Sequence, residues 1–412
     1  MTENNLKLHL DTDQNLIPQD IPAQRVIEIS LHAPVSTGSN NRPHLNLALV
    51  LDRSGSMSGE KLEYVKLAAK HVLDMLQEQD RVAMVAYDDE ISVLSTSVPV
   101  TSSNRNELKR RVSSLEIGGS TNLSDGWLAG CKEAASAAQE GTLNRSLLLT
   151  DGLANAGITD LEELAMHARE LSRRGISTST FGVGEGFNEH LLEAMSNQGG
   201  GSFYYIENPR TIPELFLREF KELSTVTARD VEIALDFPPQ VSLQVLGGWR
   251  TEVTADQMRI YLGNLVSDQT QEIYIKLLTP PAGENSQLKF TAHIFGKGEN
   301  GEILEVQDEI SFRYENRETV EAEPRKRDVL ERFGQVDLAE TANEALKLER
   351  NGENEKASRM LQRSIDENAS YIEPEKAKDY QHMAERMRRG MDESDRKASH
   401  YNTYNQKRRR QQ

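Results

Sequence analysis

The segment Leu45-Asn-Leu-Ala-Leu-Val-Leu51, followed directly by Asp52-Arg53-Ser54-Gly55-Ser56, determines which fold this chain of 412 residues can adopt. A short, nearly continuous apolar run is typical of a parallel strand whose two faces are both covered by helices. Apolar residues then recur at helical spacing from Leu62 to Leu76. The segment therefore predicts a buried strand, a tight polar loop and an amphipathic helix. In an open parallel sheet, loops at the carboxyl ends of the strands form the ligand-binding crevice.

Strands and helices continue to alternate after this first unit, as far as about Leu223. Further strands are expected at 82–87, 91–98, 146–150, 177–183 and 202–206, and further helices at 105–114, 123–138, 161–174, 188–197 and 211–223. This alternation predicts an α/β fold, a doubly wound and mostly parallel Rossmann-like sheet with helices on both faces.

The flanking regions have a different pattern, made of short β-rich segments separated by turn signals such as Pro238-Pro239 and Gly247-Gly248. Such segments follow the α/β region at 231–237, 241–246, 257–262, 271–277, 288–295 and 310–314, and precede it at 6–10 and 25–31. They predict an antiparallel β-sandwich. Because strand-like segments lie on both sides, we expect the α/β domain to be inserted in the sandwich.

The last part of the chain is highly charged and predicts an α-helical region. Apolar residues at helical spacing indicate a helical hairpin around the Asn351-Gly352 turn, and the basic end Lys407-Arg408-Arg409-Arg410 is expected to be disordered. The predicted division is N-terminal sandwich strands in 1–42, the α/β domain in 43–226, the β-sandwich in 227–318, and the helical region with its basic tail in 319–412.

Oxygen-bearing side chains gather in three loops that follow expected strands or precede an expected helix. Asp52, Ser54 and Ser56 lie in one loop, in which Gly55 is expected to permit a sharp turn. Gly118-Gly-Ser-Thr-Asn-Leu123 offers Thr121, with Ser120 as the alternative in register, and Leu147-Leu-Leu-Thr-Asp-Gly152 ends in Asp151. Carboxylate and hydroxyl oxygens are the ligands that Mg²⁺ prefers. The sequence therefore indicates a site for a hard divalent cation.

These five residues match the metal-ion-dependent adhesion site of von Willebrand factor A domains, and the resemblance extends from about His44 to Leu223. The segment Phe181-Gly-Val-Gly-Glu-Gly-Phe-Asn-Glu-His-Leu-Leu192 is similar to a strand-to-helix passage in bacterial members. The resemblance implies that Ser54, Ser56 and, in a high-affinity state, Thr121 ligate Mg²⁺ directly, while Asp52 and Asp151 act mostly through water. Mn²⁺ and Ca²⁺ are alternatives. A Glu or Asp of a partner protein then completes the coordination, and the helix at 211–223 shifts when the ligands exchange roles.

Composition excludes several other classes of function. The net charge of −17 disfavours binding to nucleic acid, which requires a positive surface. No stretch of about 18 apolar residues occurs, so no membrane span is expected. A single cysteine, Cys131, and a beginning without a basic and apolar leader suit a cytoplasmic protein. The oligomeric state is left open.

Three hypotheses about function follow. The leading one is a non-enzymatic, Mg²⁺-dependent adaptor or scaffold that binds an acidic residue of a partner protein. The second is a metal-assisted phosphoester hydrolase in which Asp52 is the nucleophile, although no lysine or second acidic motif of the required kind accompanies it. In the third, the helical C-terminal region is the main interaction element and the metal site is unused.

Overall fold

The computed structural model describes residues 6–36, 43–299 and 301–408. The chain divides into two compact units. Residues 36–226 form one of them, and the chain before and after this range forms the other, apart from the short segment 299–301.

The first unit contains a six-stranded sheet in the order β6-β5-β4-β7-β8-β9. Its strands are β4 (Leu45–Asp52), β5 (Arg81–Tyr87), β6 (Ile91–Pro99), β7 (Leu143–Thr150), β8 (Ile176–Val183) and β9 (Gly200–Ile206). All neighbours pair in parallel except the edge strand β6, which is antiparallel to β5. The predicted fold class, a mostly parallel sheet, is confirmed.

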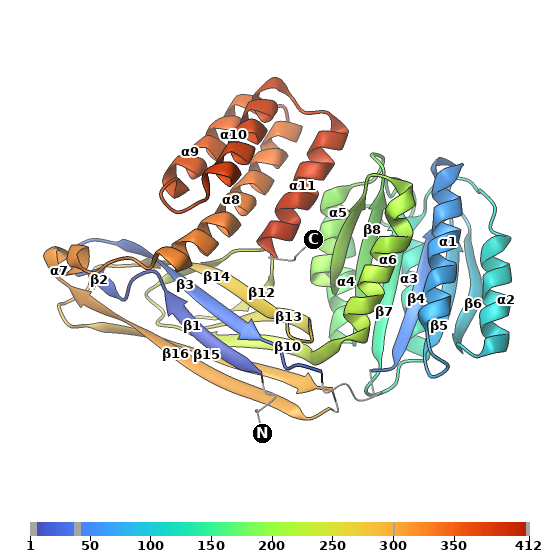
Figure 1. Ribbon diagram of the computed structural model, residues 1–412, viewed down its shortest axis with the longest axis horizontal. Helices are drawn as coiled ribbons and strands as arrows, with labels where there is room; N and C mark the ends of the chain where they lie inside the picture. Colours follow the sequence, from blue (N-terminus) through green and yellow to red (C-terminus); the bar gives the residue numbers. More distant parts are fainter. Residues whose placement is uncertain (1–5, 37–42, 300, 409–412) are drawn as a thin grey trace. The chain divides into compact units, whose positions relative to one another are not determined.

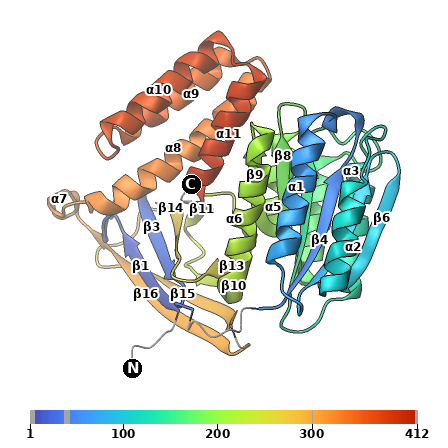
Figure 2. The ribbon, with the colours of Figure 1, turned by 45° about the vertical axis from the view of Figure 1, so that its right-hand side comes forward.

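Helices cover both faces of this sheet because the side chains of its strands alternate between two apolar surfaces. Leu47, Leu49 and Leu51 of β4 face the core that α1, α2 and α6 cover, whereas Ala48 and Val50 of the same strand face Gly130 of α3. The helices are α1 (Glu60–Met75), α2 (Ser102–Ser113), α3 (Leu123–Ser136), α4 (Leu161–Arg173), α5 (Glu189–Gln198) and α6 (Ile212–Ser224). Figures 1 and 2 show the resulting three layers.

The second unit contains two further sheets, in the orders β1-β3-β14-β11 and β12-β13-β10-β15-β16-β2. Their strands are β1 (Lys7–Thr12), β2 (Leu16–Pro18), β3 (Ala23–His32), β10 (Val226–Asp236), β11 (Ser242–Val245), β12 (Arg250–Val253), β13 (Gln257–Val266), β14 (Thr270–Thr279), β15 (Gln287–Gly298) and β16 (Ile303–Glu315). The N-terminal strand β3 pairs with β14 along its whole length. Apolar residues of both sheets share one core, so the two sheets form a β-sandwich that is continuous across the inserted unit.

The C-terminal region is helical and packs on the sandwich within the second unit. Its helices are α7 (Arg317–Ala322), α8 (Arg327–Arg350), α9 (Asn354–Asn368), α10 (Pro374–Arg389) and α11 (Glu393–Lys407). Val329 and Phe333 of α8 pack against Tyr274 of β14, and Arg332 donates two hydrogen bonds of 2.9 Å to the carboxylate of Glu28. In the described part of the chain, no helix combines the length and the apolar character needed to cross a membrane.

The end of the chain differs from the expectation of a disordered tail beginning at Lys407. That residue lies in α11, and the guanidinium carbon of Arg408 lies 3.8 Å from the centre of the Trp249 ring. Arg408 also donates a hydrogen bond of 3.2 Å to the carbonyl of Gly248. Lys407 is thus helical and Arg408 is held by stacking and this bond, so the expectation was wrong for these two residues. Arg409 and Arg410 lie outside the described residues.

Candidate metal centre

The site lies at the carboxyl edge of the parallel sheet, where β4 is flanked by β5 and β7. Leu51 pairs with Leu149, so Asp52 at the end of β4 is level with the last residue of β7, and Asp151 follows directly. The third loop, residues 118–122, leads into α3, whose N-cap side chain is Asn122. The sheet register and this helix start therefore bring three loops to one place.

Hydrogen bonds fix the loop that follows β4. The buried carboxylate of Asp52 accepts one bond of 2.8 Å from the backbone N–H of Ser54 and another of 2.7 Å from the Thr150 hydroxyl. A single 3₁₀ turn at Gly55–Met57 then places the hydroxyl oxygens of Ser54 and Ser56 3.2 Å apart. The hydroxyl of Ser56 donates to Asp151 Oδ1 over 2.6 Å. Four of the five predicted residues are thus linked side by side.

Thr121 reaches the same place from the third loop. Its hydroxyl oxygen lies 3.2 Å, and that of Ser56 3.8 Å, from the point that a Cβ on Gly152 would occupy. The backbone N–H of Thr121 donates to Asn155 Oδ1 over 3.1 Å. Thr121 is buried, whereas Ser120 is exposed. The structure therefore brings Thr121 together with the other four residues and leaves Ser120 outside.

Asp88, at the end of β5, holds the third loop against the first. Its carboxylate accepts a hydrogen bond of 3.1 Å from the N–H of Gly119 and pairs with Arg53 at 3.2 Å. A Cβ on Gly118 would lie only 1.4 Å from Asp88 Oδ2. A larger residue at position 118 would have to displace this carboxylate and break the hydrogen bond and ion pair that hold it.

Gly55 has a different role from the one expected. Its φ angle is not positive, and a Cβ there would meet the carbonyl oxygen of Gly119 at an ordinary 3.7 Å. The turn at Gly55–Met57 is an ordinary 3₁₀ turn, which does not need the conformational freedom of glycine. The backbone of Gly55 contributes instead, because its N–H donates to the carbonyl of Gly119 over 2.9 Å.

Lys61 is a member of the site that the sequence motifs did not indicate. Its Nζ lies 2.5 Å from Asp151 Oδ2 and 3.3 Å from the carbonyl oxygen of Ser56. Helical side chains point back toward the N-terminus, so a lysine in the first turn of α1 can reach the loop before the helix. The position of Lys61 in the sequence could have indicated this role. A positive charge in the first turn of a helix is unfavourable beside the helix dipole, which suggests that an acidic partner compensates it.

The donors at this edge fit a small, hard cation. Burial raises the pKa of the Asp52 carboxyl, against the opposing hydrogen bonds from Ser54 and Thr150, and a divalent cation beside it would favour the ionised form. All five side chains offer oxygen, and no cluster of three or more His, Cys, Asp or Glu suited to a metal occurs among the described residues. Three hydroxyls and two carboxylates match Mg²⁺ better than Zn²⁺, which favours nitrogen and sulfur.

The α/β unit is similar to a known family. The model of the von Willebrand factor type A domain matches residues 46–218 of this chain. The chain is similar to the uncharacterized protein sll0103 of Synechocystis sp., with 30% identity over 277 residues, 65% of this chain and 64% of that protein. It is also 30% identical over 203 residues to the uncharacterized protein YfbK of Escherichia coli, covering 49% of this chain and 35% of that protein. It thus spans less than two thirds of either relative.

Two solved structures share the fold well beyond this domain. A von Willebrand factor type A protein from Catenulispora acidiphila matches with a TM-score of 0.70 and 18% identity over 88% of both chains. The ArnB paralog VWA2 from Sulfolobus acidocaldarius matches with a TM-score of 0.66 and 18% identity over 98% of both chains. The combination of an α/β domain with additional sheets and helices is therefore shared with proteins of distant sequence.

Proposed function

We propose that this chain is a protein-binding adaptor or scaffold module whose α/β unit holds one Mg²⁺ ion and, through it, an Asp or Glu side chain of a partner protein. The observation that supports this proposal is the convergence of five oxygen-bearing side chains, from three separate loops, at the edge of the sheet where ligands bind in open α/β folds. These residues are Asp52, Ser54, Ser56, Thr121 and Asp151. Domains of this type are typically adhesion or protein-binding modules.

The residue types suit binding of an outside carboxylate. Ser54, Ser56 and Thr121 offer neutral hydroxyls as direct ligands, while Asp52 and Asp151 complete the surroundings of the ion. When bound, the ion supplies positive charge that neutral ligands leave uncancelled, and this charge attracts an acidic side chain. Lys61 adds to the attraction, because its ammonium group already neutralises part of the charge of Asp151.

Two features disfavour hydrolysis by Asp52. The residue has no exposed surface, and both of its carboxylate oxygens accept hydrogen bonds from the chain. A nucleophile must instead present an unobstructed oxygen to the substrate. A screen of phosphate esters with Mg²⁺ is expected to give no turnover, and turnover that Asp52→Asn abolishes would revive the hydrolase hypothesis.

Metal binding and partner binding are tested separately on the full chain. Titration with Mn²⁺, followed by electron paramagnetic resonance, is expected to show one site that Ser54→Ala with Ser56→Ala removes. The matched control is Ser113→Ala with Ser136→Ala, which changes two exposed serines of the same unit and should leave the site intact. If the first double variant binds Mn²⁺ as tightly as the wild type, the assignment of the metal site is wrong.

Affinity capture with Mg²⁺ and with EDTA then addresses the partner. We expect at least one protein to be retained in Mg²⁺, released by EDTA and absent from the Ser54→Ala/Ser56→Ala variant. A partner retained equally by the double variant and in EDTA would favour the C-terminal helical region as the main interaction element. Such a result, with normal Mn²⁺ binding, would show that the metal site is unused in binding.

A further inference from the structure

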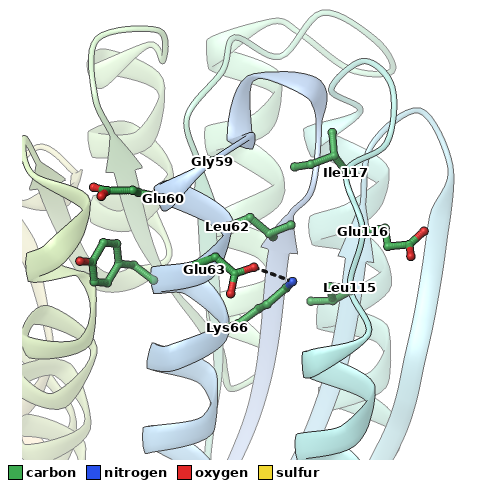
Figure 3. Close-up of a pocket in the computed structure, with 9 residues that line it drawn as sticks. Gly59, Glu60, Leu62, Glu63, Lys66, Leu115, Glu116 and Ile117 are labelled. Carbon is green, nitrogen blue, oxygen red and sulfur yellow. Dashed lines mark hydrogen bonds and ion pairs between the residues drawn. The ribbon is translucent and has the colours of Figure 1, made fainter.

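A groove of about 700 Å³ opens between α1 and the segment that follows α2. Figure 3 shows Leu62, Glu63 and Lys66 of α1 on one side, and Leu115 and Ile117 on the other. All the residues that line it belong to the α/β unit. The sequence motifs gave no indication of this groove.

The groove begins where the candidate metal centre ends. Backbone hydrogen bonds join the first and third loops of the centre, from Gly55 to Gly119 over 2.9 Å and from Gly118 to Arg53 over 2.8 Å. Beyond these bonds the two segments of the chain diverge and form the two walls of the groove, with α1 on one side and Ile117 on the other. A segment bound at the metal centre can therefore continue directly into the groove.

The lining is apolar at its base. Leu62 and Leu115 are buried there, while Ile117 is 40% exposed and points into the space between the walls in Figure 3. An exposed isoleucine beside two buried leucines leaves apolar surface available to a ligand. The base of the groove suits an aliphatic or aromatic side chain.

The charged residues around the groove are mainly acidic. Lys66 pairs with Glu63 at 2.8 Å, and only 12% of the Lys66 side chain is exposed. This pair cancels, and Glu60 is itself paired with Arg210 at 3.6 Å. The remaining negative charge among the lining residues therefore comes from Glu116, whose side chain points away from the groove on one flank (Figure 3). A negative flank beside an apolar base is complementary to an apolar residue accompanied by lysine or arginine.

We propose that this groove binds the same partner segment whose carboxylate reaches the metal centre, and that it selects an apolar side chain with a neighbouring Lys or Arg. This inference rests on the proposed function and adds a second determinant to it. The occupant is a peptide segment with an acidic residue for the metal centre, followed or preceded at a fixed spacing by an apolar and basic pair. The groove would then distinguish between partners that all present an acidic residue.

A peptide library displayed on phage provides the test, with one fixed Asp flanked by randomised positions. It is selected in Mg²⁺ on the full-length wild-type protein and on three full-length variants. These are Ile117→Ser for the apolar base, Glu116→Lys for the acidic flank, and Met166→Ser as control. Met166 is a similarly exposed apolar residue on α4 of the same unit. Circular dichroism and Mn²⁺ binding verify that each variant is folded.

The wild type and Met166→Ser are expected to enrich an apolar residue and a Lys or Arg at constant distances from the Asp. Ile117→Ser should bind the selected peptide about tenfold more weakly, as expected for loss of an apolar contact, and should lose the apolar preference. The lysine variant should lose the basic preference. In the wild type, the selected peptide should shift the methyl resonance of Ile117 in a nuclear magnetic resonance titration.

Three outcomes would overturn the inference, and they separate it from the proposed function. If acidic peptides are selected in Mg²⁺ and Ile117→Ser binds them as tightly as the wild type, the groove is not part of the binding site, but the proposed metal-dependent function is retained. Selection of apolar and basic peptides that bind equally in EDTA would reject both. Self-association that depends on Ile117, seen by sedimentation without peptide, would assign the groove to a second copy of this chain and also reject the inference.

Discussion

At the scale of single residues, the candidate metal centre combines two acidic side chains with one permanent positive charge. Lys61 contacts Asp151, and its side chain is 30% exposed. In the absence of a metal ion, the ammonium group compensates a carboxylate that is otherwise buried beside Asp52. The same group opposes any second positive charge placed there. Lys61 therefore stabilises the ion-free site and lowers its affinity for cations.

Replacing Lys61 with methionine removes the charge and keeps an aliphatic side chain. We expect Mn²⁺ to bind about tenfold more tightly, which corresponds to ~1.4 kcal/mol, and the ion-free protein to unfold at a lower temperature. Paramagnetic resonance titration and thermal unfolding in EDTA measure the two effects. Lys66→Met is the control, because Lys66 pairs with Glu63 on the same helix. Weaker Mn²⁺ binding by Lys61→Met would contradict this role.

The two glycines of the site differ in the space around them. Gly118→Ala places a Cβ against the buried carboxylate of Asp88, and we expect a loss of about 1–3 kcal/mol in the free energy of unfolding together with weaker Mn²⁺ binding. Gly55→Ala has room for its methyl group and should bind Mn²⁺ normally. Chemical denaturation and metal titration of both variants check this prediction, and equal behaviour of the two would refute it.

The sequence could locate the loop residues of the site but not the side chains that hold them. Asp52 and Asp151 follow from the chain order, since the ends of parallel strands meet at one edge of the sheet, and Thr121 was indicated by its place at the start of a helix. The contacts of Lys61 and Asp88 depend on how far a long side chain folds back and on the separation of two loops. Neither quantity is present in a motif or in a hydrophobic pattern.

At the scale of helices and strands, a buried ion pair anchors α6 to the sheet. Arg145 of β7 contacts Glu219 of α6 at 2.6 Å, and Ser179 and Tyr204 donate further hydrogen bonds of 2.6 and 2.8 Å to the same carboxylate. Burial opposes ionisation of Glu219, but these partners outweigh it, so the pKa of Glu219 lies below its usual value of 4.5. Any displacement of α6 has to rearrange this network.

Glu219→Gln should destabilise the protein by about 3–5 kcal/mol at neutral pH, because Arg145 is left buried without a counter-charge. The low pKa of Glu219 stabilises the folded state above about pH 4.5, and this contribution is lost as the pH falls through the folded-state pKa. The variant should therefore lose less stability in acid than the wild type does.

Thermal unfolding of both proteins between pH 3 and pH 7 measures the difference. The control is Glu222→Gln, which alters a partly exposed pair with Arg218 on the same helix and should change stability by at most about 1 kcal/mol. Parallel pH profiles for the wild type and Glu219→Gln would show that the carboxylate does not contribute in this way.

The elements that the sequence pattern identified are those that bury an apolar face. Helix α1 and strand β4 were predicted almost to the residue because their apolar spacing is regular. Strands β2 and β12 are short and lie at sheet edges. Strand β2 pairs with β16, which is distant in the chain, and the four residues of β12 are too few to show a regular pattern. Helix α11 buries Lys397, His400 and Asn405. Because such polar residues give no apolar pattern, the sequence predicted a helical region here without locating this helix.

At the scale of the whole molecule, the helical region is fastened to the sandwich by mixed contacts. Phe333 of α8 meets the Tyr274 ring edge-on, with ring centres 6.3 Å apart. Arg332 bonds to Glu28, which lies on an N-terminal strand, and Lys276 of β14 pairs with Asp337. The helices therefore depend on strands from both ends of the chain.

Phe333→Ala should remove about 3–5 kcal/mol of stability, as expected for a large buried aromatic side chain. The lost contact is the one between α8 and β14. Amide hydrogen exchange should therefore accelerate in α8 and stay unchanged in the α/β unit. Glu344→Ala, at an exposed position of the same helix, is the control. Uniform acceleration throughout the chain would show that the two units do not unfold separately.

The pairing of β3 with β14 has a consequence for the order of events on the ribosome. The edge of β3 that bonds to Thr270–Thr279 is complete long before its partner has been translated, since the entire α/β unit comes between them. At roughly 5–20 residues per second, the interval is on the order of tens of seconds. During that time the nascent chain carries an unpaired strand beside a unit that has already emerged, and unpaired strand edges are prone to aggregation. The edge of β3 therefore needs protection during synthesis, which a chaperone bound to the nascent chain would give.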